Sequence, residues 1–138
     1  MNAVTPVFER ALSSIPEFCR SHWLLRIPLA IIIIQQGLAK FPLSSDDALS
    51  FELPFVIWAL TAFSELFVGI ALILGGIMKG WSGDLLSRAG GMTLALIITG
   101  VITVTNWGPV LDILLYDHLH VLLLVGGLYF GFRGNRVK

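Results

Sequence analysis

The chain has almost none of the residues that build a disulfide framework or a cysteine-ligated metal site. Cys19 is the only cysteine among 138 residues, which excludes an internal disulfide, a CxxC redox pair and a cysteine-rich zinc or iron–sulfur centre. Charged residues are also scarce, at 13% of the sequence against about a quarter in soluble domains. The nine basic residues form no run and the formal net charge is zero, so the footprint of a nucleic-acid-binding protein is missing.

Apolar residues, by contrast, make up 56% of the sequence and gather in four long stretches. Each stretch is long enough to cross about 30 Å of hydrocarbon at about 1.5 Å per helical residue. The stretches cover residues about 23–41, 54–78, 86–106 and 110–132. The start of the fourth stretch stays open between Pro109 and Tyr116. The sequence therefore predicts an all-α membrane protein, with a four-transmembrane-helix bundle over residues 23–138.

The first 22 residues have a different pattern. Apolar side chains recur there every three or four positions, with polar residues between them, and Pro16 interrupts the series. The apolar set is Val7, Phe8, Ala11, Leu12, Ile15, Phe18 and Cys19. Such spacing is typical of an amphipathic helix in the membrane interface. We expect residues 1–22 to form an interfacial segment on the cytoplasmic side; the alternative is a frayed tail. No small-residue cleavage site closes the first apolar stretch, so we expect a retained span there.

The basic residues are distributed unevenly between the two ends of the predicted spans. Eight of the nine lie on one side: Arg10, Arg20, Arg26, Lys79, Arg88, Arg133, Arg136 and Lys138. The other side has only Lys40, together with the acidic residues of the first and third connections. Lys and Arg beside membrane spans favour the cytoplasmic side, so both termini and the turn at Lys79 should be cytoplasmic. We expect a multi-pass protein of a bacterial inner membrane.

Small residues are frequent inside the predicted spans. Gly76 and Gly80, and Gly127 and Gly131, each have the G-x-x-x-G spacing, and Gly91 lies in the third span. Small residues let helix backbones approach closely in lipid, where no hydrophobic force drives helices together. We expect this packing to occur within one bundle; contact with a neighbouring subunit is the alternative.

A few polar side chains interrupt the apolar stretches, and each needs a reason because ionisable groups in hydrocarbon are costly. Each predicted span has a basic residue at its cytoplasmic end, from which depth can be measured along the helix. Measured in this way, Lys40, Glu65 and His120 lie about 20–21 Å deep. Thr103 lies at a similar depth of about 22 Å. These depths predict one hydrogen-bonded polar cluster inside the bundle. Its expected members are Lys40, Glu65, His120, Gln36, Thr103 and Asp117.

Alternatives stay open for the charged members of this cluster. Glu65 can form a structural ion pair with Lys40 or act as a functional carboxyl, and Lys40 can instead reach the periplasmic surface. Asp117 lies three residues before His120, a spacing at which its carboxylate can orient the imidazole. That imidazole could serve a proton relay or bind quinone, or it could lie in the wet interface without a role. His118 points away from His120 at this spacing, so we expect no metal site.

Three short motifs lie in the first two spans: Arg26-x-x-Leu29-Ala30, Gly37-Leu38-Ala39-Lys40, and Glu65-Leu66-Phe67-Val68-Gly69 with the apolar run to Gly75. Together they resemble motifs of the DoxX family. The resemblance covers residues about 24–133 and implies a four-helix membrane bundle linked to redox chemistry. Of the site residues, Lys40 and Glu65 match the family pattern. Gln36 stands where many relatives have a histidine, and the family's small-residue and Asp signature after the fourth span is missing.

The resemblance implies a small membrane subunit that is accessory to, or assembles with, a membrane oxidoreductase or electron-transfer complex and can contact quinone. We expect no complete active site in this chain, and the sequence fixes no cofactor. An independent quinone-linked redox enzyme is the first alternative, and a small transporter or proton pathway is the second. The expected partners are the lipid bilayer and either a larger membrane complex or further copies of this chain, but not nucleic acid.

Overall fold

The computed structural model describes residues 20–105 and 108–135, and all the regular structure in these ranges is helical, with no strand. The helices are α2 His22–Leu38, α3 Ser45–Ser50, α4 Phe55–Ile77, α5 Trp81–Thr105, α6 Val110–Tyr116 and α7 His118–Arg133. The prediction of an all-α protein is confirmed for this part of the chain. The predicted interfacial segment over residues 1–22 lies almost entirely outside the described residues.

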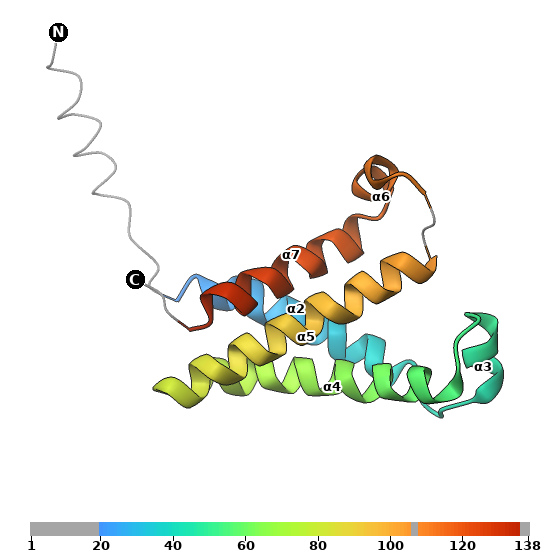
Figure 1. The fold of residues 1–138 in the computed structure, drawn as a ribbon. Helices are drawn as coiled ribbons and strands as arrows, with labels where there is room; N and C mark the ends of the chain where they lie inside the picture. Colours follow the sequence, from blue (N-terminus) through green and yellow to red (C-terminus); the bar gives the residue numbers. More distant parts are fainter. Residues whose placement is uncertain (1–19, 106–107, 136–138) are drawn as a thin grey trace, which may run out of the picture.

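The four longer helices lie side by side, and the two short ones lie at one end of the molecule (Figure 1). α4 packs against α2 and α5, and α5 packs against α7, whereas α2 and α7 have little contact. We call the end of the molecule opposite α3 and α6 the basic end. It carries Arg26, Lys79, Arg88 and Arg133. The first and last described residues also lie there (Figure 1).

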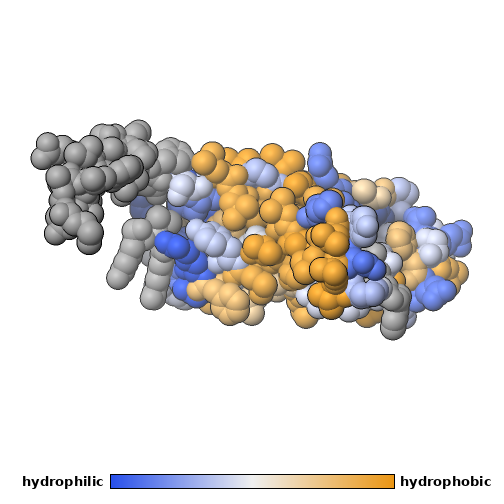
Figure 2. Space-filling view, turned by 90° about the horizontal axis from the view of Figure 1, so that it is seen from above, coloured by the Kyte–Doolittle hydropathy of each residue, from blue (hydrophilic) through white to orange (hydrophobic). Residues whose placement is uncertain are grey.

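The interior is apolar, and so is much of the outer surface. Leu29, Ile33, Leu72, Leu94 and Phe130 are fully buried where the helices meet. Large apolar side chains are also exposed on all the long helices, and Figure 2 shows hydrophobic residues across the middle of one face with hydrophilic ones toward its ends. Soluble monomers rarely expose apolar patches beyond a few hundred Å². The surface is therefore compatible with a lipid environment.

Length and composition limit which helices can cross a membrane. α4, with 23 residues, and α5, with 25 residues, are long and apolar enough. α6 and α7 satisfy the same condition only as a pair, and they are bent by 99° at the break between them. α2 is apolar but has 17 residues. Within residues 20–105 and 108–135, two helices can thus span a membrane, and the bent pair would make a third span if it crosses as one unit.

The segment predicted as one span over residues 110–132 is divided in the structure. Asp117 leaves helical geometry, with φ −106° and ψ 57°, and its carboxylate accepts a hydrogen bond from the His120 backbone N–H. An aspartate in this position caps the first turn of α7, because the first N–H groups of a helix have no partner within the helix. The fourth long helix therefore begins at His118, after the later of the two starts that the sequence left open.

Glycines bring α5 and α7 close together. A Cβ atom added at Gly91 would meet backbone atoms of Gly127 and Gly131, and one added at Gly127 would lie 2.9 Å from the Gly91 carbonyl oxygen. The small residues of these helices are thus used within one bundle, as expected. Gly80 has φ +86° in the turn between α4 and α5, so the Gly76–Gly80 pair is not a helix-packing motif.

Candidate functional site

An ion pair joins the turn after α2 to the middle of α4. The Lys40 ammonium donates hydrogen bonds to both carboxylate oxygens of Glu65, at 2.8 Å to Oε1 and 2.6 Å to Oε2. The Glu65 side chain is 3% exposed and that of Lys40 is 13% exposed. Lys40 Nζ also lies 3.3 Å from the Gln36 carbonyl oxygen. Both charges are therefore neutralised where water has little access.

One aromatic ring lies beside this ion pair. Lys40 Nζ lies 5.3 Å from the centre of the Trp58 ring, within the range of a cation–π contact. Phe51 stacks on Trp58 with ring centres 5.1 Å apart, and Phe41 meets Phe63 edge-on at 5.6 Å. A low-polarity surround strengthens the attraction between the two charges and makes either of them costly alone.

A second pair lies at the start of α7. His120 Nδ1 is 2.6 Å from Asp117 Oδ1, and both side chains are partly buried. The pair lines a pocket of about 430 Å³ whose other residues are Thr105, Gly108, Asp112, Ile113 and Tyr116. When Nδ1 donates to Asp117, a neutral imidazole keeps Nε2 as a hydrogen-bond acceptor, and a protonated one makes Nε2 a donor. The site can exchange a proton or bind a carbonyl group.

The structure does not join these two pairs into one cluster. The hydrogen bonds of Lys40 and Glu65 run to each other and to the Gln36 carbonyl, and none reaches His120. The Gln36 side chain is exposed, and the Thr103 hydroxyl donates to Gly100 of its own helix at 2.7 Å. Glu65 lies on α4 and His120 on α7, and these two helices pack against α5 rather than against each other. Equal depth along the spans therefore does not bring the two side chains into contact.

No group of three His, Cys, Asp or Glu side chains that could hold a metal ion occurs within residues 20–105 and 108–135. His118, which lies two residues before His120, is exposed.

The most extensive polar network was not predicted from the sequence. Arg26 is fully buried, and its guanidinium donates to the Leu72 carbonyl, to Ser87 Oγ at 2.8 Å and to Asn135 Oδ1 at 2.7 Å. The Ser87 hydroxyl also donates to Asn135 Oδ1, and the Asn135 side-chain amide donates to the Gly75 carbonyl. This network ties α2, α4 and α5 to Asn135, the second residue after α7, at the basic end.

Two further contacts complete the basic end. Asp84 accepts hydrogen bonds from Arg88 Nε at 2.9 Å and from the Asn135 backbone N–H at 2.8 Å. Arg88 also donates to the Phe132 carbonyl at 2.6 Å, at the last turn of α7. The sequence signal was a serine inside the third apolar stretch and an asparagine just after the fourth, both of which need polar partners when buried. In the sequence, Arg26 is a flanking charge and part of a DoxX-like motif, and neither feature predicts its burial.

Comparison with known proteins adds no relative, because no family model, no curated protein and no solved structure matches this chain.

Proposed function

We propose that this chain is a DoxX-like integral membrane protein that serves as an accessory subunit of a membrane oxidoreductase complex. One observation carries the proposal. Lys40 and Glu65, the two positions that match the DoxX pattern, lie 25 residues apart and form one buried ion pair at 2.6 Å. This contact joins two separate motifs of the resemblance, and for that reason it supports the proposal.

The proposal includes a four-segment membrane bundle in a bacterial inner membrane. α4 and α5 have spanning length, α6 and α7 together form a broken third segment, and the 17 residues of α2 give about 26 Å of helix. A length of 17 residues is at the short end for a membrane span. The basic end would face the cytoplasm, and both termini with it.

The pocket beside Asp117 and His120 supports contact with quinone. A quinone head group offers carbonyl oxygens, and the protonated His120 imidazole, with Nδ1 donating to Asp117, can donate to one of them from Nε2. The pocket lies at the end of α5 and α7 away from the basic residues, next to exposed apolar side chains of α6 that can contact an isoprenoid tail. An accessory subunit can present such a site to a catalytic partner.

Native mass spectrometry of the chain isolated from its own membranes in mild detergent tests the accessory role. Stoichiometric co-isolation with redox subunits is the expected result, and it would name the complex. Recovery only as a monomer or homo-oligomer would contradict it.

The independent quinone-linked enzyme is the second candidate, and the Asp117–His120 pocket is the observation that favours it. A quinone bound to the isolated chain, lost on His120→Leu and kept on His118→Leu, would support this alternative. The His118 variant is a matched control because His118 is exposed, lies two residues before His120 and is not part of the pocket.

A further inference from the structure

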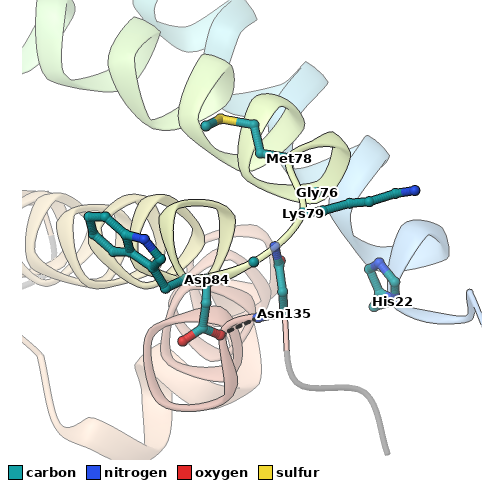
Figure 3. Close-up of a pocket in the computed structure, with 8 residues that line it drawn as sticks. His22, Gly76, Met78, Lys79, Asp84 and Asn135 are labelled. Carbon is teal, nitrogen blue, oxygen red and sulfur yellow. Dashed lines mark hydrogen bonds between the residues drawn. The ribbon is translucent and has the colours of Figure 1, made fainter.

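A separate pocket of about 550 Å³ opens at the basic end of the bundle. It lies where α2 begins, where α4 turns into α5, and beside Asn135, two residues after the end of α7 (Figure 3). Its lining residues are His22, Gly76, Met78, Lys79, Gly80, Trp81, Asp84 and Asn135. The pocket is remote from Lys40 and Glu65, which lie toward the other end of α2 and α4.

Positive charge exceeds negative charge around this pocket. Arg26, behind Asn135, has three hydrogen-bond partners, and all of them are neutral groups. Asp84 is the one carboxylate of the lining, and it is already paired with Arg88. Within the part of the chain that the structure describes, no carboxylate forms an ion pair with Arg26 or Lys79. The pocket is therefore suited to an anion.

Two lining groups have capacity left for a ligand. The Lys79 side chain is exposed, and His22 Nδ1 is buried with no hydrogen-bond partner among the described residues. In Figure 3 the side chains of Lys79 and His22 lie on the same side of the pocket, with Asn135 between them and Asp84. An anion beside Lys79 and His22 would thus be kept apart from the Asp84 carboxylate.

The rim of the pocket is apolar and matches a membrane interface. Trp81 is 79% exposed, and Ile77 and Met78 beside it are exposed as well. Tryptophan is enriched where a membrane meets water, because its ring is apolar and its N–H is polar. A ligand that fits both the cationic pocket and this rim needs an anionic head and apolar chains.

We propose that this pocket binds the phosphate head group of an anionic phospholipid, with Lys79 and His22 on the phosphate and the acyl chains along Ile77 and Trp81. Basic pockets between membrane helices on the cytoplasmic side bind such head groups in general. The site rests on the membrane orientation proposed above, but not on the redox role or on the accessory role.

Lipid binding to the purified full-length chain tests the proposal by native mass spectrometry. The probes are phosphatidylglycerol and phosphatidylcholine with identical acyl chains, each added in equal amounts to the detergent-solubilised protein. Phosphatidylglycerol should bind in preference. Lys79→Gln should weaken that binding about fivefold, as expected for the loss of one cation near the head group. His22→Gln should weaken it as well.

Arg133→Gln is the matched control, because Arg133 is a cation of the same end that does not line the pocket. It should leave phosphatidylglycerol binding nearly unchanged. Equal binding of the two lipids, or an equal loss in the Lys79 and Arg133 variants, would overturn the proposal. Displacement of phosphatidylglycerol by inorganic phosphate alone would also overturn it, since the pocket would then be a site for a small soluble anion.

Discussion

Two buried cations are accommodated in different ways in this protein. Lys40 is neutralised by a carboxylate, whereas Arg26 is held by neutral oxygens and by the Phe130 ring, 4.4 Å from its guanidinium. Both members of a buried ion pair can be replaced together at little cost in stability, because each charge mainly offsets the burial cost of the other. Arg26 cannot be removed that way, since its hydrogen-bond acceptors belong to two other helices, α4 and α5, and to Asn135 beyond the end of α7.

The first prediction concerns the Lys40–Glu65 pair. Glu65→Gln leaves a lysine cation beside Trp58 without a counter-charge, and we expect it to lower the free energy of unfolding by about 3 kcal/mol. Lys40→Met should cost a similar amount because it leaves the Glu65 carboxylate alone. The double variant Lys40→Met/Glu65→Leu should recover most of the loss. Unfolding in detergent measures all three, and additive losses would show that the two charges are not coupled.

The second prediction concerns Arg26. Arg26→Ala removes the largest fully buried side chain of the described residues, opens a cavity and leaves Asn135 and Ser87 short of a donor. We expect a loss of about 3 kcal/mol or more in the free energy of unfolding. The control is Arg20→Ala, an exposed arginine six residues earlier and just before α2, which should change stability by less than about 0.5 kcal/mol. Equal effects of the two variants would refute a structural role for the buried network.

At the scale of the elements, apolar length predicts that a helix exists better than it predicts where that helix ends. The second and third predicted spans coincide with α4 and α5 to within a few residues at most boundaries. The sequence analysis predicts neither α3 nor the break before α7, because each depends on a single capping side chain. Ser44 Oγ accepts the Asp46 backbone N–H and starts α3 in a segment expected to be a loop. Asp117 likewise starts α7 inside an apolar run.

The third prediction concerns this start of α7. Asp117→Ala removes the acceptor for the His120 backbone N–H and for the imidazole, so the first turn of α7 should fray. Loss of a helix cap costs about 1 kcal/mol, which corresponds to an increase of about fivefold in local opening. Amide hydrogen exchange at His120 and Val121 should accelerate accordingly. Exchange in the middle of α5 serves as the internal control, and a uniform acceleration there too would indicate global destabilisation instead.

The fourth prediction concerns the contact between α5 and α7. Gly91→Ala would place a methyl group 2.6 Å from the Gly127 carbonyl oxygen, and backbone atoms on both helices cannot move aside cheaply. We expect a loss of about 1–3 kcal/mol in the free energy of unfolding from this overpacking. Gly100→Ala is the matched control on the same helix, because no atom lies within 4 Å of its added methyl group. That variant should stabilise the protein by about 0.5–1 kcal/mol.

At the scale of the whole molecule, the sequence gives the depth of each polar group but not the face of the helix that carries it. Depth correctly placed Lys40 and Glu65 within reach of each other, because α2 and α4 are neighbours. The same argument put His120 at their level, yet α7 packs mainly on α5 and keeps it apart. Which helices are neighbours depends on contacts such as Gly91 against Gly127, and these require the three-dimensional arrangement.

The distribution of charge over the molecule leads to the last prediction, on its orientation in the membrane. The basic end and the opposite end, which carries Asp46, Asp47 and Glu52 in and after α3, should lie on opposite sides of the bilayer. Site-directed labelling in intact cells tests this, in a Cys19→Ser background that removes the only native thiol. Asp46→Cys and Lys79→Cys then each provide one exposed thiol, at opposite ends of the described residues.

A membrane-impermeant maleimide should label the Asp46→Cys protein in intact spheroplasts and the Lys79→Cys protein only after the membrane is opened. The physical reason is that moving the basic end across the membrane would place several Lys and Arg residues on the side that their insertion disfavours. Labelling of the Lys79→Cys protein alone from outside would show that the orientation is the opposite of the one predicted. Labelling of both positions from the same side would mean that α4 does not cross the bilayer, since α4 separates them. That outcome would contradict the four-segment bundle itself, because α4 is the more hydrophobic of the two single helices that are long enough to span.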